Sequence, residues 1–260
     1  MRARSLSVAA PLAVVVVLLG AWELAARWDV LADALNIEPF LVPAPSEVAQ
    51  ALWEDRSLLA DNAWVTLQEV LLGLALALAL GYSLAVALHL SPALRRALYP
   101  LLVASQAVPI IAIAPILVVW LGFGNGPKLA IIALICFFPV TVNTLDGLRA
   151  VDPALVRMMR TLDAGRRRIF THVEAPSSLP YFFSGAKIAA AVAVIGAVFG
   201  EWSGADEGLG HLILTAQAQL QTARVFAAVV VLSAIALALV GTLTLAQQRF
   251  AGWATSSEPR

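Results

Sequence analysis

The stretch Asp146–Pro180, DGLRAVDPALVRMMRTLDAGRRRIFTHVEAPSSLP, decides how the chain is organised. It is the longest polar interval between two strongly apolar runs. A cationic segment that flanks membrane-length apolar runs stays on the cytoplasmic side of a bilayer, so we expect this loop to be cytoplasmic. The arginines that carry the charge are Arg149, Arg157, Arg160, Arg166, Arg167 and Arg168.

Two short helices are predicted within this loop, at Pro153–Thr161 and Arg166–Val173, on either side of Asp163-Ala164-Gly165. Pro176 and Pro180 are expected to end the unit, because proline interrupts helices. A pair of helices is too large for a plain turn between two spans. The pattern therefore predicts that a cytoplasmic partner binds this part of the chain.

The composition is that of an integral membrane protein. Of the 260 residues, 60% are hydrophobic and 13% are charged, and the mean hydropathy is +0.85. Soluble domains are about 45–50% apolar and about 25% charged. The formal net charge is zero, so attraction to nucleic acid is not indicated. We treat residues 1–260 as a single transmembrane domain.

The predicted fold class is an all-α polytopic membrane protein with about six transmembrane helices. A helix needs about 20 apolar residues to cross the hydrocarbon core. The second and fifth spans are rich in Ala and Gly, which let helices approach closely, so both are expected in the interior. The spans are Val8–Leu24, Thr66–His89, Leu98–Leu121, Lys128–Leu145, Tyr181–Gly200 and Val225–Ala246.

The positive residues predict the orientation. With the N-terminus inside, the cytoplasmic side receives Arg2 and Arg4, Arg95 and Arg96, and the long loop, whereas most acids fall outside. We therefore expect a multi-pass protein of the cell (inner or plasma) membrane with both termini cytoplasmic. The cations left on the outer side are Arg27, Arg56, Lys128 and Arg224.

A few residues at span ends and bends are candidates for a solute pathway. Pro109 and Pro115 should bend the third span, either for packing alone or to line a path. Glu201, followed by Trp202, lies at the outer end of the fifth span, where it could touch or gate a solute. Glu69 and Lys187 are weaker candidates. All three ionisable residues are also close enough to an interface to reach the headgroups.

Enzyme chemistry finds no support in the sequence. Gly122–Lys128 resembles a phosphate-binding loop, but Pro127 precedes the lysine and no Ser or Thr follows it, so a tight turn is expected. His89, His172 and His211 are too scattered for metal ligands. We expect no metal site, no nucleotide site and no catalytic residues in this chain.

The long loop resembles the "EAA" loop of permeases from binding-protein-dependent ABC importers. The E-A-A positions fall on Arg157, Met158 and Met159, and the loop glycine of the family falls on Asp163. Ala175 stands in place of the leucine before the first proline of the motif. The matching residues are Thr161-Leu162-Asp163-Ala164-Gly165, Ile169-Phe170, Val173, Pro176 and Leu179-Pro180.

The resemblance covers nearly the whole chain. The six-span layout, Pro45–Val48 and the proline-rich third span resemble the sulfonate, nitrate and taurine branch. Pro180–Gly210 is more similar to the branch that imports hydroxymethylpyrimidine, a thiamine precursor. The resemblance implies the type I importer permease fold with a coupling helix seated on an ATPase. Its ATPase-coupling residues are then Thr161, Leu162, Asp163, Ala164, Gly165, Arg166, Arg167, Arg168 and Phe170.

The resemblance also implies partners: two ATPase subunits that bind ATP and Mg, an extracytoplasmic solute-binding protein, and a second permease copy as a homodimer. Membrane lipid surrounds the assembly. The expected function is ATP-driven import of a small solute, most like the pyrimidine. An importer of sulfonate-, nitrate- or taurine-like anions, a secondary transporter without an ATPase, and a membrane scaffold stay open. The nearly charge-free span centres favour the ATPase-driven class over a secondary transporter.

Overall fold

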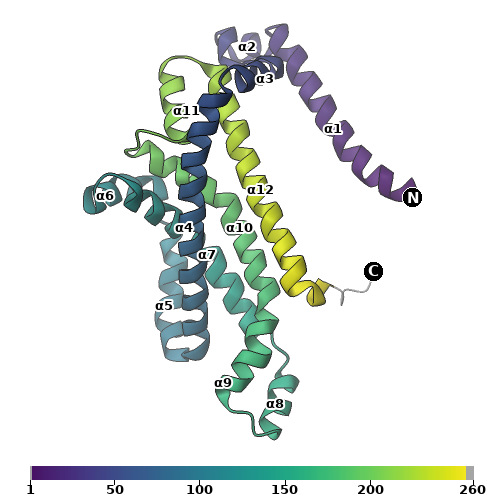
Figure 1. The fold of residues 1–260 in the computed structure, drawn as a ribbon, viewed down its shortest axis with the longest axis vertical. Helices are drawn as coiled ribbons and strands as arrows, with labels where there is room; N and C mark the ends of the chain where they lie inside the picture. The colour runs from purple at the N-terminus through teal and green to yellow at the C-terminus, as the bar shows by residue number, and fades with distance from the viewer. Residues whose placement is uncertain (1, 256–260) are drawn as a thin grey trace.

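The protein is represented by a computed structural model that describes residues 2–255, and every regular element in that range is helical (Figure 1). Within these residues four helices are long and apolar enough to cross a membrane. Together with the bent pair described below and the 26-residue helix α1 (Arg2–Arg27), they agree with the predicted count of about six. The four are α4 (Arg56–Leu90), α7 (Asn125–Arg149), α10 (Ala175–Trp202) and α12 (Thr222–Thr255).

The core lies where α4 and α10 pack against α7. Small residues bring these helices together: a Cβ on Gly185 would lie 2.6 Å from the carbonyl oxygen of Pro139, and one on Gly73 would lie 2.6 Å from the Ile132 side chain. Ala189 and Ala193 of α10 are fully buried. The expectation that the second and fifth spans lie in the interior is therefore confirmed. Close backbone approach of this kind is how helices associate in a bilayer.

The predicted bend of the third span is confirmed at Pro109, where it is sharp enough to break the helix. The two parts, α5 (Pro92–Ser105) and α6 (Ile110–Leu121), meet at 103°. Pro109 lies at the break with an extended backbone, and it lacks the N–H that a continuous helix would need. Val108, the residue before the proline, is also disfavoured in the helical region, so the turns that follow α5 do not continue into α6. Pro115 lies inside α6 rather than at the bend.

The cytoplasmic loop of the prediction forms a protruding unit at one end of the molecule (Figure 1). Its first helix, α8 (Pro153–Thr161), has the predicted bounds. The second, α9 (Arg166–Ile169), passes into a π-helical turn, η2 (Phe170–Glu174), and on into α10 without interruption. Residues 153–174 are called the knob below.

The prediction that Pro176 and Pro180 end this unit is wrong. Pro176 lies in the first turn of α10, directly after the π turn η2, and the helix continues past it. Pro180 lies inside α10, and the helix continues past it. The second predicted helix is therefore the beginning of a membrane span, and the knob is covalently continuous with α10.

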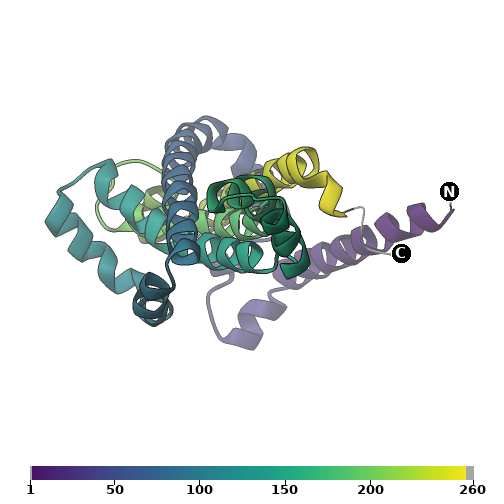
Figure 2. The ribbon, with the colours of Figure 1, turned by 90° about the horizontal axis from the view of Figure 1, so that it is seen from below.

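The end opposite the knob is called the far end. It holds the short elements that join the long helices, and α1 leaves the bundle from there at an angle (Figures 1 and 2). These elements are α2 (Val30–Leu35), the 3₁₀ turn η1 (Pro39–Leu41), α3 (Pro45–Glu54) and α11 (Leu209–Ala218). The knob and the far end are the two places where polar groups concentrate around the apolar bundle.

Candidate functional site

The knob carries an exposed apolar stripe. Asp152 caps α8 by accepting a hydrogen bond from the Ala154 N–H at 2.7 Å. From this start, Leu155, Met158 and Leu162 follow at helical spacing and are 44%, 53% and 69% exposed. Large apolar side chains gathered on a small polar protrusion are typical of protein–protein interaction surfaces.

The tip of the knob is the short connection between α8 and α9, and it has free space beside it. Asp163 has a φ of +55°, a left-handed conformation that Asp adopts more readily than most residues. The family pattern places its loop glycine at this position, so the backbone explains that preference. Gly165 begins α9 with an ordinary φ of −66°. A Cβ at Gly165 would meet no atom within 4 Å, so this side of the tip has free space around it.

Most of the predicted coupling residues gather at this tip. Arg167 and Arg168 are exposed on α9 beside the sequence from Thr161 to Gly165. Arg166 and Phe170 instead turn back toward the bundle, where both approach His89 at the end of α4. Leu155 and Met158 were missed from the sequence, although their i, i+3 spacing with the exposed Leu162 was the signal for them.

The far end contains a buried charge cluster formed by Thr66, Glu69, Lys128 and Glu201. The Nζ of Lys128 lies 2.5 Å from the Oε1 of Glu69. Thr66 donates its hydroxyl proton to the Oε1 of Glu201 at 2.6 Å. The side chains come from α4, α7 and α10, so the cluster joins the three core helices. In the described part of the chain, the second oxygen of Glu69 has no hydrogen-bond donor.

Glu201 and Trp202, predicted for the solute pathway, hold α11 in place. Glu201 is 1% exposed, and its Oε2 accepts hydrogen bonds from the backbone N–H groups of Gly210 and His211 at the start of α11. The indole N–H of Trp202 donates to the Gly210 carbonyl at 3.0 Å. Both side chains thus bond within the chain, and their pathway role stays a prediction.

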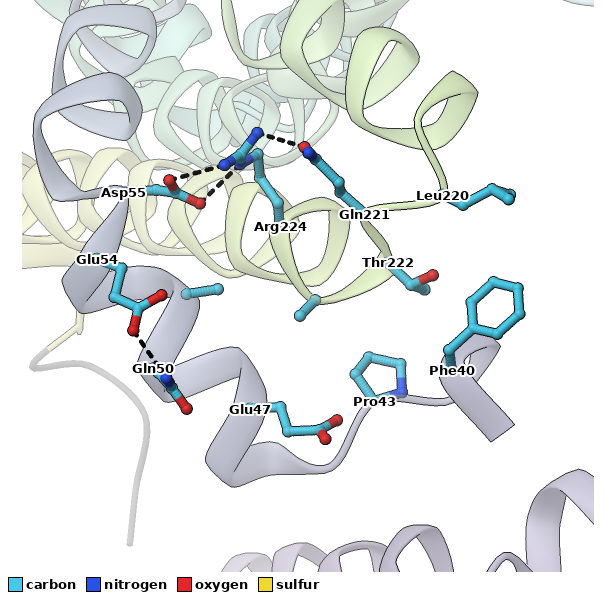
Figure 3. Close-up of a pocket in the computed structure, with 12 residues that line it drawn as sticks. Phe40, Pro43, Glu47, Gln50, Glu54, Asp55, Leu220, Gln221, Thr222 and Arg224 are labelled. Atoms are coloured by element: carbon cyan, nitrogen blue, oxygen red, sulfur yellow. Dashed lines mark hydrogen bonds and ion pairs between the residues drawn. The ribbon is translucent and has the colours of Figure 1, made fainter. Parts of the chain in front are cut away.

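A second ion pair of the far end borders a groove of about 460 Å³ between α3 and the start of α12 (Figure 3). Arg224 donates to both carboxylate oxygens of Asp55, at 2.7 and 2.9 Å. The bidentate geometry ties α12 to the N-terminal end of α4. Glu47 and Glu54 also line the groove. The far end is thus fastened by charged contacts, whereas small residues pack the middle of the bundle.

Two adjoining cavities run beside α7. One, of about 410 Å³, lies at the α5–α6 break and is lined by residues that include Gln106, Pro109 and Phe137. The other, of about 720 Å³, lies between α4 and α7 and shares Leu134 and Phe137 with the first. We call the two together the track. Of the predicted pathway residues, Pro109 lines the track.

The described residues that line the track carry no charge. Ser105 and Gln106 provide polar groups at the break, and Ser83 provides one between α4 and α7. Nor do the described residues contain a group of three or more His, Cys, Asp or Glu side chains that could hold a metal ion. The arrangement can therefore bind a small solute through apolar contact and neutral hydrogen bonds.

Known proteins with similar sequences are membrane components of transporters. The family model "Binding-protein-dependent transport system inner membrane component" matches residues 77–252. A "Probable ABC transporter permease protein" of Haemophilus influenzae is 39% identical over 92% of this chain and 96% of its own length. The "Formylaminopyrimidine transport permease protein ThiX" of Halalkalibacterium halodurans is 39% identical over 79% of this chain and 82% of its own.

A third relative and a solved structure agree with these matches. The "Riboflavin transport system permease protein RibX" of Chloroflexus aurantiacus is 37% identical over 88% of this chain and 86% of its own length. The crystal structure of an amino acid ABC transporter superposes with a TM-score of 0.61 at 15% identity, covering 77% of this chain and 97% of that one. It supports the fold alone. The family match and the identities show that this chain belongs to the binding-protein-dependent transport system inner membrane components, the permease subunits of ABC importers.

Proposed function

We propose that this permease imports a small, uncharged nitrogen heterocycle, most like a pyrimidine precursor of thiamine. The observation that carries the proposal is the uncharged track beside α7. The aromatic ring of Phe137 offers a stacking face to a heterocycle, and the Gln106 amide offers both a donor and an acceptor. The names of two relatives refer to heterocyclic solutes, formylaminopyrimidine and riboflavin, which supports the same class.

The broken span supports a second permease copy. Residues 106–109 lie between α5 and α6 with exposed side chains. Irregular backbone at membrane depth is tolerated only where protein or a water-filled cavity covers it, because lipid cannot satisfy its polar groups. A second copy of this chain facing the track would cover the break and enclose a wet path between the two copies. The assembly proposed is therefore a homodimer.

The knob supports an ATPase as the energy source. Its exposed stripe of Leu155, Met158 and Leu162 needs a covering protein. Each of the two permease copies would dock one ATPase subunit, which binds ATP and Mg and carries out the hydrolysis. A solute-binding protein would deliver the solute to the far end. This chain itself then performs no chemistry; it provides the path and the attachment point.

The proposed orientation places the knob and both termini in the cytoplasm, on the basis of the arginines of the loop. Single cysteines on a Cys136→Ala background test it. A cysteine at Asp206, exposed at the far end, is expected to react with a membrane-impermeant maleimide added to whole cells or spheroplasts. A cysteine at Ala154, exposed on α8, is expected to react only after the membrane is opened. The reverse labelling would overturn the orientation.

A second candidate solute is an alkanesulfonate such as taurine. The observation that favours it is the N-terminus of α6, because Ile110 begins that helix and lines the track. A helix N-terminus carries a partial positive charge of roughly half a unit, which attracts anions. A full cation on the path is absent among the described lining residues. The uncharged heterocycle therefore fits the track better.

Uptake into proteoliposomes that contain the permease, its ATPase and its binding protein distinguishes the two solutes. We expect ATP-dependent uptake of labelled formylaminopyrimidine and none of taurine. Gln106→Leu removes the amide of the track and should lower uptake about 2- to 10-fold, as expected for one neutral hydrogen bond. Gln248→Leu, the same change at an exposed position of α12 away from the track, is the control and should transport normally. Uptake of taurine without the pyrimidine would contradict the proposal.

A further inference from the structure

The knob contacts the end of α4 through three charged or polar side chains. Glu174 of η2 places its Oε2 at 3.0 Å from the Nε2 of His89, the penultimate residue of α4. Its Oε1 accepts a hydrogen bond from Arg166 of α9 at 2.6 Å. Arg166 also approaches the His89 ring nitrogen at 3.1 Å. These three residues are called the inner cluster.

Within the inner cluster, Glu174 is the bridging group. Its two carboxylate oxygens serve different helices, one contacting α4 and the other α9. Its side chain is 6% exposed and that of His89 is 11% exposed, whereas that of Arg166 is 49% exposed. Contacts made away from water are stronger and more directional than the same contacts at the surface. The Glu174 bridge therefore fixes the knob against the end of α4.

The π turn places Glu174 in this position. Residues Phe170–Glu174 form η2, which is wider than an α-helical turn and shifts the side chains that follow it around the helix axis. The Phe170 ring lies 6.5 Å from the His89 ring, so two residues of the turn face the same point on α4. Single π turns inside helices are frequent at functional sites. Here the π turn places side chains of the knob in contact with the end of α4.

The same helix α4 takes part in the buried charge cluster at the far end. Thr66 and Glu69 of α4 bond there to Glu201 and Lys128. Thr66 and His89 are 23 residues apart, which is about 35 Å along a helix at about 1.5 Å per residue. The helix between them contains no proline. One continuous helix thus connects the knob to the group of contacts that fastens the far end.

We infer that α4 carries movement of the knob to the far end, and that Glu174 is the positioning residue that joins the knob to α4. The inference rests on the proposed ATPase docking at the knob. When the ATPase subunits close and displace the knob, the inner cluster moves the end of α4, and the far-end cluster moves with it. The competing route is α10 alone, which is continuous with the knob. The two routes differ in whether removal of the inner cluster matters.

The test uses the complete transporter with its ATPase and binding protein. Glu174→Gln keeps the size of the side chain and removes the charge. The complex is expected to assemble and to keep basal ATP hydrolysis within about twofold. Stimulation of hydrolysis by the loaded binding protein, and solute uptake, should fall at least about tenfold. Asp146→Asn, the analogous charge removal at the exposed end of α7, should behave as wild type.

A spin label at Asp61, on α4 near the far end, reports the movement itself. In the wild type the distance between the labels of the two copies should change on ATP binding, and in Glu174→Gln it should not. Loss of stimulation without loss of assembly or basal hydrolysis is a result that a merely structural role would not give. A normal ATP-dependent distance change in Glu174→Gln would overturn the inference and assign transmission to α10.

His89→Ala covers the case in which Glu174→Gln fails to assemble. It cuts the contact on the α4 side and leaves the Arg166–Glu174 pair inside the knob intact. An assembled but uncoupled His89→Ala transporter supports the inference, and an assembled and coupled one refutes it. A wild-type complex that shows no ATP-dependent uptake at all would count against the proposed function. Wild-type uptake with unaffected variants would count against this inference alone.

Discussion

A tryptophan in place of Gly165 is expected to separate the chain from its ATPase without disturbing the chain's own fold. A Cβ at Gly165 meets nothing within 4 Å and the residue has an ordinary φ, so the structure accommodates the indole on the open side of the tip. If the tip is seated in a groove of the ATPase, that space is filled by the partner. Overpacking a fitted contact costs about 1–3 kcal/mol or more, which weakens binding roughly 5- to 150-fold.

Co-purification with the ATPase from detergent-solubilised membranes measures the effect. Gly241→Trp is the matched control, because Gly241 lies in α12 and a Cβ there also meets nothing within 4 Å. Gly241→Trp should retain the ATPase, whereas Gly165→Trp should lose it while inserting into the membrane in normal amounts. Wild-type retention of the ATPase by Gly165→Trp would show that the knob does not dock through its tip.

Lys128→Ala is expected to destabilise the permease strongly. The Lys128 ammonium lies 2.5 Å from Glu69, and the two side chains are 9% and 3% exposed. Removing one partner of a buried ion pair leaves the other charge uncompensated, which costs about 3–5 kcal/mol. The other charged neighbour of Glu69 in the cluster is the Glu201 carboxyl, which cannot compensate a negative charge. Thermal unfolding in detergent should show a large downward shift.

Two companion variants separate this explanation from simple loss of packing. The double change Lys128→Met with Glu69→Gln removes both charges and should recover most of the stability. Arg27→Ala, which breaks the pair with Glu23 at a side chain that is 63% exposed, should cost no more than about 1 kcal/mol. Equal stability of Lys128→Ala and the wild type would mean that Glu69 carries no buried charge in need of compensation.

The knob could be predicted from the sequence because its signals are local. Asp152 followed by Pro153 is a helix start, and α8 begins at that proline. The end of this unit, in contrast, could not be predicted from local sequence signals. Pro176 and Pro180 predicted a stop, but the π turn before them lets the chain enter α10 directly. A proline that lies within a continuous transmembrane helix has the same local sequence pattern as one that ends a helix.

The sharp break of the third span and the far-end cluster could be recognised only in the tertiary structure. Hydropathy is continuous across residues 98–121 and the prolines predicted a bend, but neither gives the 103° angle at which α5 and α6 meet. Glu69, Lys128 and Glu201 each stood out as charged residues at span ends. Their pairing depends on how α4, α7 and α10 pack, and residues 59 or more positions apart give no spacing signal. Snorkelling to the headgroups was therefore the wrong explanation for Glu69, which is 3% exposed and paired.

We propose that this permease moves its solute only when a partner ATPase that is docked on the knob hydrolyses ATP. The direct measurement is solute uptake into the proteoliposomes described above, with ATP, without nucleotide, and with a non-hydrolysable ATP analogue. We expect uptake of the pyrimidine in the presence of ATP and none in the other two conditions, with no effect of an imposed proton or sodium gradient. Equal uptake without ATP, or uptake driven by an ion gradient, would contradict the proposal.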